Sequence, residues 1–351
     1  MTSCWKDSEH VLCVRLDTLG DVLMTGPAIR ALREARPGRR ITLLTSPAGA
    51  AVAELMPEVD DTIVYRAPWM KGYDPPPETA IVEELRTRGF DGAAVFTVFD
   101  QSPLPAALLC HQAGVPLRLA HCREKPYALL TDWVPEPEQG QPTRHEVRRQ
   151  LDLVAAIGAT TRDERLAVEI PAAARERVAR LVASAGGWAV IHPGGTAPSR
   201  RYPIELWAQV CELLACEHGL ELIVTGDEAD RELAAALPRT RSVAGELSLA
   251  ELAALLAEAP LLLAGNTGPV HLAAAVGTPV VDLYALTNPQ HTPWMVDSKV
   301  LSHDVPCRWC YGSVCREGHH LCLRGVPPER VVEAALALLP PVSSPPRRVI
   351  E

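Results

Sequence analysis

The sequence predicts an α/β protein with two doubly wound parallel sheets that face each other across a cleft. Short apolar runs alternate with segments of helical spacing along nearly the whole chain, which is the pattern of parallel βαβ units. This pattern stops near residue 170 and starts again near residue 189, so it occurs twice. A length of 351 residues is long for one hydrophobic core and suits two domains.

The first half opens with an apolar run at 11–16, and helical spacing follows over 22–35. Further strands are expected at 41–45, 62–65, 93–99 and 117–120, and further helices at 50–56 and 145–157. Two proline-bearing stretches lack periodicity, so we predict loops at 69–78 and 133–143. A linker near residue 170 ends this half.

The second half repeats the alternation. Strands are expected at 189–192, 220–225, 261–264 and 280–284, and helices at 204–218, 229–237, 249–257, 269–276 and 331–339. The predicted domains are 1–171 and 172–340, the second with a cysteine-rich segment at 307–322, and 341–351 is a tail. In open α/β sheets ligands bind at the carboxyl ends of the strands, so the turns that leave the strands are the candidate sites.

Composition narrows the class of protein. The net charge of −9 argues against a nucleic-acid partner, which would need a basic face. The first ten residues are polar and do not form a signal peptide, and no apolar run approaches the roughly 18–20 residues of a membrane span. We therefore expect a cytoplasmic protein. Six of its ten cysteines are scattered singly and are expected to be buried apolar residues.

The first candidate turn runs from Leu16 to Asp21 and leads from the first strand into the first helix. Gly20 would permit a tight turn there. Asp21 has two interpretations. It could be the N-cap of the helix, a position that aspartate favours. It could also face the cleft as a general base, which would take the proton from an attacking hydroxyl.

The second turn carries two glycines, two hydroxyls and two arginines, namely Gly194, Gly195, Thr196, Ser199, Arg200 and Arg201. Adjacent glycines let backbone N–H groups approach an anion, and arginine adds bidentate donors, so the turn suits a diphosphate. The alternative is an ordinary glycine turn with surface arginines. Neither a dinucleotide fingerprint nor a phosphate-loop motif is present.

The third turn begins at Gly265 and opens a helix. Pro269 falls at the first helical position, where its missing N–H costs nothing. The free N–H groups and the helix dipole would then form an anion site. Gly277 is expected to end the helix. The alternative is a well-capped structural helix in which His271 is half-buried.

Three segments, in this order and spacing, resemble glycosyltransferase family 9, the heptosyltransferases of lipopolysaccharide core assembly. They read VLCVRLDTLGDVLMTGPAIRALREARP from residue 11, IHPGGTAPSRRYPIELWAQV from residue 191 and GNTGPVHLAAAVGTPVVDLYALTNP from residue 265. The resemblance extends from residue 11 to about residue 337. Three motifs in register are more specific than any one of them.

The resemblance implies the GT-B architecture of two Rossmann-like domains and an inverting glycosyltransferase that needs no metal or other cofactor. The donor would be a nucleotide-diphosphate sugar such as ADP-heptose, bound by 172–340. The acceptor would be a glycan or a small glycoside, bound by 1–171. Acceptors in this family are usually lipid-core sugars, so peripheral contact with a membrane stays open.

Carried over by position, Asp21 matches the catalytic base of the family. The residues that would bind the donor are Gly194, Gly195, Thr196, Arg200, Asp230, Leu247, Asn266, Thr267, Gly268 and His271. In that set Thr196 and Arg200 would contact the diphosphate, Asp230 would hold the ribose and Leu247 would pack on the base.

The chain departs from the family pattern at three places. Asn266 stands where the family usually has aspartate, which leaves the donor sugar open. Arg200 replaces the usual lysine, and the two differ in phosphate geometry. Asp17 and Thr18 stand where two serines are common.

The cysteine-rich segment contains Cys307, Cys310, Cys315 and Cys322, with His319 and His320 between them. Four thiolates at short spacing could bind a structural zinc ion. Two disulfides or four free thiols are the alternatives. We interpret the segment as an accessory element outside the reaction centre.

Two other functions remain compatible with the motifs. A nucleotide-sugar epimerase of the GT-B fold would share the donor domain but need no acceptor. A non-catalytic nucleotide-sugar-binding protein would not need a general base, so the turn with Gly20 and Asp21 argues against this alternative. A dehydrogenase is disfavoured because no GxGxxG follows the first strand of either half.

Overall fold

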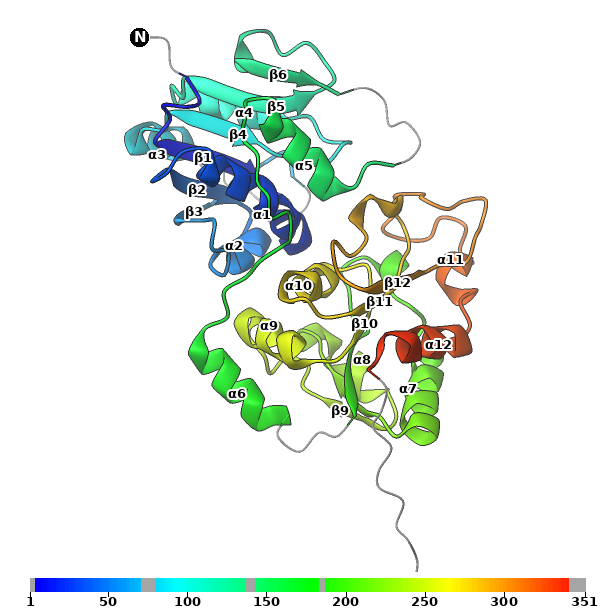
Figure 1. The fold of residues 1–351 in the computed structure, drawn as a ribbon. Helices are drawn as coiled ribbons and strands as arrows, with labels where there is room; N and C mark the ends of the chain where they lie inside the picture. Colours follow the sequence, from blue (N-terminus) through cyan, green and yellow to red (C-terminus); the bar gives the residue numbers. More distant parts are fainter. Residues whose placement is uncertain (1–3, 71–79, 137–142, 183–186, 341–351) are drawn as a thin grey trace, which may run out of the picture. The chain divides into compact units, whose positions relative to one another are not determined.

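The computed structural model describes residues 4–70, 80–136, 143–182 and 187–340. The chain divides into two compact units, one of Met1–Glu169 with Pro289–Trp294 and the other of Ile170–Asn288 with Met295–Glu351. Each unit contains a six-stranded parallel sheet (Figure 1). Most of the loop predicted at 69–78 and the whole tail predicted at 341–351 lie outside the described residues.

The sheet of the N-terminal unit has the order β3-β2-β1-β4-β5-β6. Its strands are β1 (His10–Arg15), β2 (Arg40–Thr45), β3 (Asp61–Val64), β4 (Gly92–Val95), β5 (Leu117–Cys122) and β6 (Asp132–Pro135). The prediction of a loop over 133–143 was wrong at its start, because β6 pairs with β5 along the edge of the sheet. The strand was missed because only alternate residues of β6 are partly buried, so it lacks an apolar run.

Five helices flank this sheet in the described part of the unit. They are α1 (Leu19–Glu34), α2 (Pro47–Ala53), α3 (Ala80–Arg88), α4 (Leu104–Gln112) and α5 (Glu146–Ala155). Helix α1 packs against α2 and α5, whereas α3 packs against α4. Leu12 and Val14 of β1 share a core with α3 and α4. The pleat of the strand therefore directs Arg15 toward the face that α1 and α5 cover.

Helices α1 and α2 each begin three residues earlier than predicted. Gly20 is consequently the second residue of α1 and does not form a tight turn. In α2 the side chain of Ser46 caps the helix by accepting a hydrogen bond from the backbone N–H of Gly49 at 3.0 Å. Both helices therefore start directly at the carboxyl end of the preceding strand.

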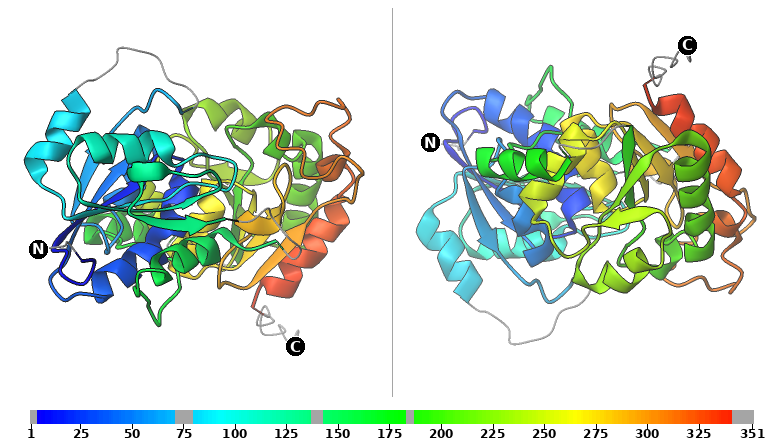
Figure 2. Two further views of the ribbon diagram at one scale, coloured as in Figure 1. Left: turned by 90° about the horizontal axis from the view of Figure 1, so that it is seen from above. Right: turned by 90° about the horizontal axis from the view of Figure 1, so that it is seen from below.

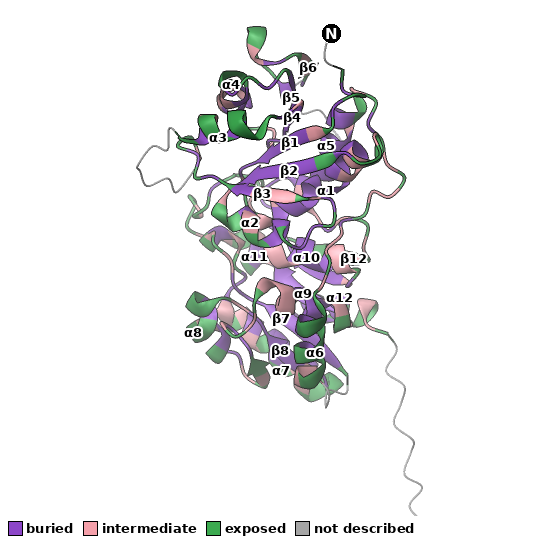
Figure 3. Ribbon diagram, turned by 90° about the vertical axis from the view of Figure 1, so that its left-hand side faces the viewer, coloured by how far each residue is buried: buried purple, intermediate pink, exposed green. Residues whose placement is uncertain are grey.

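The sheet of the C-terminal unit has the order β12-β11-β10-β7-β8-β9. Its strands are β7 (Trp188–His192), β8 (Glu221–Val224), β9 (Thr240–Ser242), β10 (Leu262–Gly265), β11 (Val280–Leu283) and β12 (Ser298–Leu301). The sequence did not predict the two edge strands β9 and β12, which are short and mostly exposed or half-buried. Figure 3 shows the central strands in the colour of buried residues.

The helices of this unit are α6 (Ala172–Val182), α7 (Ile204–His218), α8 (Arg231–Ala235), α9 (Leu249–Glu258), α10 (Gly268–Val276), α11 (Leu321–Arg324) and α12 (Pro328–Leu338). Helices α7 and α12 lie side by side (Figure 2), and α9 packs against both α6 and α10. Gly277 ends α10 with φ 82°, as predicted. Among the residues described, no helix is long and apolar enough to cross a membrane.

Candidate active site

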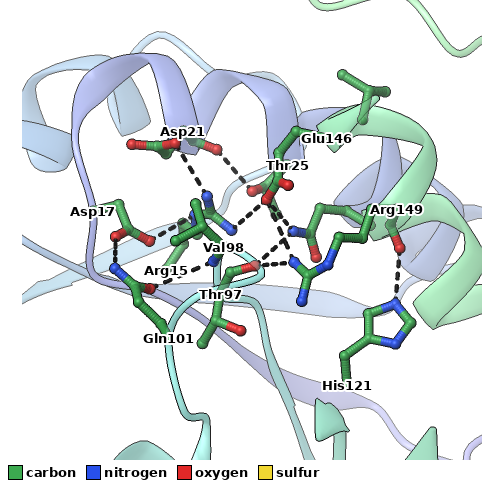
Figure 4. Close-up of polar contacts among 12 residues, drawn as sticks. Arg15, Asp17, Asp21, Thr25, Thr97, Val98, Gln101, His121, Glu146 and Arg149 are labelled. Carbon is green, nitrogen blue, oxygen red and sulfur yellow. Dashed lines mark hydrogen bonds and ion pairs between the residues drawn. The ribbon is translucent and has the colours of Figure 1, made fainter. Parts of the chain in front are cut away.

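Arg15, the last residue of β1, is surrounded by three carboxylates (Figure 4). Its Nε atom lies 3.0 Å from Oδ2 of Asp17, an ion pair without the geometry of a hydrogen bond. Its Nη2 atom lies 3.2 Å from Oδ1 of Asp21, and its Nη1 atom lies 3.2 Å from Oε1 of Glu146. Burial alone would lower the pKa of Arg15, but the three carboxylates raise it. The guanidinium therefore remains charged inside the unit.

Asp21 is the third residue of α1, and the N-cap position belongs to Thr18. The interpretation of Asp21 as the N-cap was therefore wrong, although the carboxylate does interact with the cap. Oδ2 of Asp21 accepts hydrogen bonds from the backbone N–H of Thr18 at 3.2 Å and from its hydroxyl at 2.7 Å. The positive end of the helix dipole favours a carboxylate in this first turn. Thr18 and Arg15 together fix the orientation of the Asp21 side chain, which is 16% exposed.

Asp17 is the second carboxylate in this turn. Burial raises the pKa of Asp17 to about 6, and the neighbouring Asp21 and Glu146 add to the increase. Arg15 and a hydrogen bond from Nε2 of Gln101, 2.5 Å from Oδ1, oppose it. From the sequence, Asp17 was expected in the first candidate turn and as a departure from the family pattern, without a role of its own. Its raised pKa comes mainly from burial, an environment that only the tertiary structure creates.

Helix α5 contributes a second layer of polar contacts behind Arg15 (Figure 4). Gln150 donates hydrogen bonds to Oε1 of Glu146 at 2.6 Å and to the backbone oxygen of Thr97 at 3.0 Å. Arg149 binds both carboxylate oxygens of Glu136, at 2.5 and 2.7 Å. Burial would raise the pKa of Glu136, but the hydrogen bonds from Arg149 hold it below its usual value. These contacts attach α5 to the carboxyl end of the sheet.

A cavity of about 760 Å³ lies beside this cluster, where β1, β2, β3 and β4 end. Asp17, Thr18 and Gln101 line it together with Ser46, Arg66, Thr97, Asp100 and Ser102. The other walls are largely apolar and include Leu16, Tyr65, Trp69, Met70, Val95, Phe96, Pro105 and Ala106. The volume falls in the range of small-molecule sites. The carboxylate cluster therefore adjoins a space that can hold a sugar or a small glycoside.

In the C-terminal unit, two glycines allow three strand-exit loops to meet. A Cβ atom on Gly194 would lie only 2.1 Å from Oδ2 of Asp230, and one on Gly195 would lie 3.0 Å from Cγ2 of Thr267. Gly194 and Gly195 thus lie against Asp230 and Thr267, which were also predicted to bind the donor. The sequence separates these residues by more than 30 positions, and the parallel sheet brings them to one edge.

Thr267 is the N-cap of α10, and Gly268 and Pro269 form the start of its first turn. His271 is buried within the same helix. Asn266 forms two hydrogen bonds with Ala285, donating from Nδ2 to its oxygen at 3.0 Å and accepting from its N–H at 3.3 Å. An aspartate could not donate the first of these bonds. The departure from the acidic family residue therefore has a structural reason.

Arg200 lies half-buried in the short helix η2 (Pro198–Arg200). Its Nε atom is buried and has no hydrogen-bond partner in the described part of the protein. Asp282 on β11 is fully buried, and burial raises its pKa well above the usual value, although the charge of Arg200 opposes this. Thr196 is exposed, and Leu247 is half-buried between β9 and α9. The Nε–H group of Arg200 is thus a donor in this loop that is left for a ligand.

Of the three alternatives for the cysteine-rich segment, the zinc site is not supported. In residues 307–322, as in the rest of the described chain, no three His, Cys, Asp or Glu side chains are placed to hold a metal ion. All ten cysteines are free thiols. Sγ of Cys307 lies 3.7 Å from Nε2 of His319, and Sγ of Cys315 accepts a hydrogen bond from the N–H of His320 at 3.4 Å. The structure therefore corresponds to the free-thiol alternative.

Two Rossmann-like units in one chain are the fold of the GT-B glycosyltransferases, as predicted. The model of glycosyltransferase family 9 (heptosyltransferase) matches residues 79–321, and the chain belongs to this family. Family membership makes the protein a glycosyltransferase and favours this function over the epimerase and the non-catalytic binding protein.

Similar proteins support the assignment over nearly the full length. Lipopolysaccharide heptosyltransferase 2 of Escherichia coli is 25% identical over 94% of this chain and 98% of its own. The family 9 glycosyltransferase of Veillonella parvula has a TM-score of 0.78 at 22% identity and covers 96% of this chain and 98% of its own. E. coli heptosyltransferase WaaC, solved with ADP-2-deoxy-2-fluoro heptose, has a TM-score of 0.68 at 21% identity, with coverage of 93% and 99%.

Proposed function

We propose that this enzyme transfers heptose from ADP-heptose to a hydroxyl of a glycan or small glycoside, with inversion at the anomeric carbon. Residues 1–171 bind the acceptor and residues 172–340 bind the donor. The acceptor oxygen forms a bond to the anomeric carbon, and the bond to the diphosphate breaks. ADP leaves with the electron pair, and Asp21 takes the proton of the hydroxyl. No metal or other cofactor takes part. The cytoplasm is the expected location.

The observation that carries this proposal is the ion pair between Asp21 and Arg15, next to the cavity. Arg15 compensates the charge of the carboxylate, and Thr18 orients it through two hydrogen bonds. Thr18 also lines the 760 Å³ cavity, so an acceptor bound there would lie close to the base. A general base must lie within hydrogen-bond reach of the proton that it removes. The apolar and aromatic walls suit the apolar faces of sugar rings.

The donor assignment is supported by the cluster of loops at Gly194, Gly195 and Thr267. Backbone N–H groups near glycines and at a helix start bind phosphate oxygens, and arginine adds charge. We assign Arg200, Thr196, Gly268 and His271 to this site as well. The relative WaaC was solved with an ADP-heptose analogue, which makes ADP-heptose the first donor to test. A lipopolysaccharide-type glycan is the first acceptor to test, because the E. coli relative is named for lipopolysaccharide.

The decisive experiment compares the Asp21→Asn and Asp21→Ala variants with the wild type. Removing a general base typically costs about 10²- to 10⁴-fold in rate, so we expect kcat to fall by that factor. The affinity for ADP, measured by calorimetry, should change less than about twofold, because Asp21 lies in the other unit.

Asp7→Asn is the matched control. Asp7 is exposed in the same unit and is not among the residues that line the cavity, so its loss should leave kcat within a factor of about three. Full turnover by Asp21→Ala would remove Asp21 from the mechanism. Conversion of ADP-heptose to another nucleotide sugar without any acceptor would refute the transferase assignment.

A further inference from the structure

The cysteine-rich segment folds onto the loop that contains Arg200. The N–H of Ser199 donates to the oxygen of Ser313 at 3.1 Å, and its hydroxyl donates to the oxygen of Gly312 at 2.7 Å. Nε2 of His320 lies 2.8 Å from the oxygen of Ser199. A carbonyl oxygen only accepts, so Nε2 of His320 carries the proton and donates. Every polar group of Ser199 is therefore bound to a segment more than 110 residues away in sequence.

These contacts bear directly on Arg200, the next residue. Ser199 is 5% exposed, so its bonds to the segment are shielded from water. On another side, a Cβ atom at Gly265 of β10 would lie 2.5 Å from the oxygen of Arg200, which shows how closely the strand approaches. The backbone of Arg200 is thus confined by β10 and, through Ser199, by the segment. Its buried Nε atom has no partner among the described groups, and a bound anion would satisfy it.

The conformation of His320 in turn depends on the thiols. His320 has φ 52°, a left-handed value that is uncommon for a non-glycine residue. Its N–H donates to Sγ of Cys315 at 3.4 Å. A change at the Cys315 thiol would therefore alter the backbone at His320, whose imidazole holds Ser199.

We propose that the cysteine-rich segment is part of the donor site, with His320 as a positioning residue that holds Ser199 and, through it, Arg200 in place for the donor diphosphate. The identity of the anion rests on the proposed function. Preorganised donors bind and stabilise charge better than donors that must first be ordered. By linkage, a donor that binds the ordered loop also orders the segment and protects its thiols.

The first test separates donor binding from turnover. In His320→Ala, the KM for the donor and the Kd for ADP should rise about five- to tenfold, while kcat changes less than twofold. His320→Gln can place an amide N–H near the position of Nε2 and should recover most of the affinity. The matched control is His319→Ala, because His319 contacts Cys307 and the N–H of Leu321 instead of Ser199. Wild-type Kd in His320→Ala, or equal losses in the His319 and His320 variants, would overturn the proposal.

The second test requires no turnover. A chain carrying Cys4→Ser and Cys216→Ser loses the two exposed cysteines outside the segment. Its remaining accessible thiolates attack dithiobis(nitrobenzoate), forming a mixed disulfide and releasing one thionitrobenzoate anion for each thiol. Saturating ADP should slow this reaction at least threefold, and His320→Ala should abolish the protection. An unchanged rate with ADP would contradict the linkage.

Arg200→Ala distinguishes the two proposals. If its Kd for ADP equals that of the wild type, the donor site itself is wrongly placed. If Arg200→Ala weakens ADP binding but His320→Ala does not, the donor site stands and only the role of the segment fails. Circular dichroism of each variant establishes that it is folded, and His320→Gln keeps the test valid if His320→Ala unfolds.

Discussion

Asp17→Asn tests the electrostatic description of the Arg15 cluster. The pKa of Asp17 is about 6 in the folded protein, against an ordinary value of 3.8. A folded-state pKa above the unfolded one means that the folded state binds the proton more tightly. The protonated form therefore contributes stability that is fully present below about pH 4 and is lost as the pH rises to about 6. About two pKa units at roughly 1.4 kcal/mol each correspond to about 3 kcal/mol.

Asparagine does not titrate, so the stability of the variant should not fall with rising pH through residue 17. The difference in the free energy of unfolding, variant minus wild type, should therefore increase by about 2 kcal/mol from pH 4.5 to pH 7.5. This is less than the full value of about 3 kcal/mol because the interval covers only part of the titration of Asp17. The lost ion pair with Arg15 lowers the variant's stability at both pH values, so the change with pH isolates the titration. The side chain is only 9% exposed, so solvent screening should not remove the effect.

The assay is urea unfolding of the full chain at both pH values, followed by circular dichroism and tryptophan fluorescence. Asp100→Asn is the control, because it makes the same chemical change at an exposed aspartate beside the same cavity. If the stability of Asp17→Asn relative to the wild type does not increase from pH 4.5 to pH 7.5, the Asp17 carboxylate is not a destabilising buried charge. The description of the cluster would then be wrong.

Two further predictions concern the C-terminal unit. In Gly194→Ala, the new methyl group would lie 2.1 Å from Oδ2 of Asp230. We therefore expect the free energy of unfolding in urea to fall by about 1–3 kcal/mol and ADP to bind more weakly. Adding Asp230→Ala should restore part of the lost stability, and additive effects of the two substitutions would contradict the contact. Asn266→Asp removes the hydrogen bond to the oxygen of Ala285 and adds a buried charge. The free energy of unfolding at pH 7.5 should therefore fall by about 1–3 kcal/mol. Unchanged stability would show that the hydrogen bonds between Asn266 and Ala285 are dispensable.

Much of the fold was predictable because central parallel strands are buried on both faces and therefore consist of continuous apolar residues. β1 and β10 were recognised in this way. The edge strands β6, β9 and β12 were not recognised, because their residues are mostly exposed or half-buried and form no apolar run, whereas the edge strand β3 contains Ile63 and Val64 and was predicted. The first turns of α1 and α2 were missed because Thr18 and Ser46 place the helix start immediately after the strand.

The site was predictable only where chemistry is local in sequence. Asp21 and the glycines at 194 and 195 could be proposed as site residues because each follows shortly after an apolar strand. Glu146 could not be found, because it reaches Arg15 from 131 residues away on a helix whose register depends on tertiary packing. The bond between His320 and Ser199 spans 121 residues and was likewise invisible. The spacing of the cysteines left zinc, disulfides and free thiols open, and in the described residues no three His, Cys, Asp or Glu side chains are placed to hold a metal ion.

Arg15 explains why so many acidic residues can gather at the end of β1. A buried arginine is costly unless its charge is compensated, and one carboxylate would suffice for that. Three are present, and Glu146 is shared with Arg149, whose Nη1 atom lies 3.5 Å from its Oε1 atom. Burial raises the pKa of Asp17 to about 6, and the charges of Asp21 and Glu146 add to the increase. The charge beside Arg15 therefore changes when Asp17 binds a proton below about pH 6. On the proposed mechanism, the turnover of the wild type should change in this pH range, whereas Asp17→Asn, which does not titrate, should lack that change.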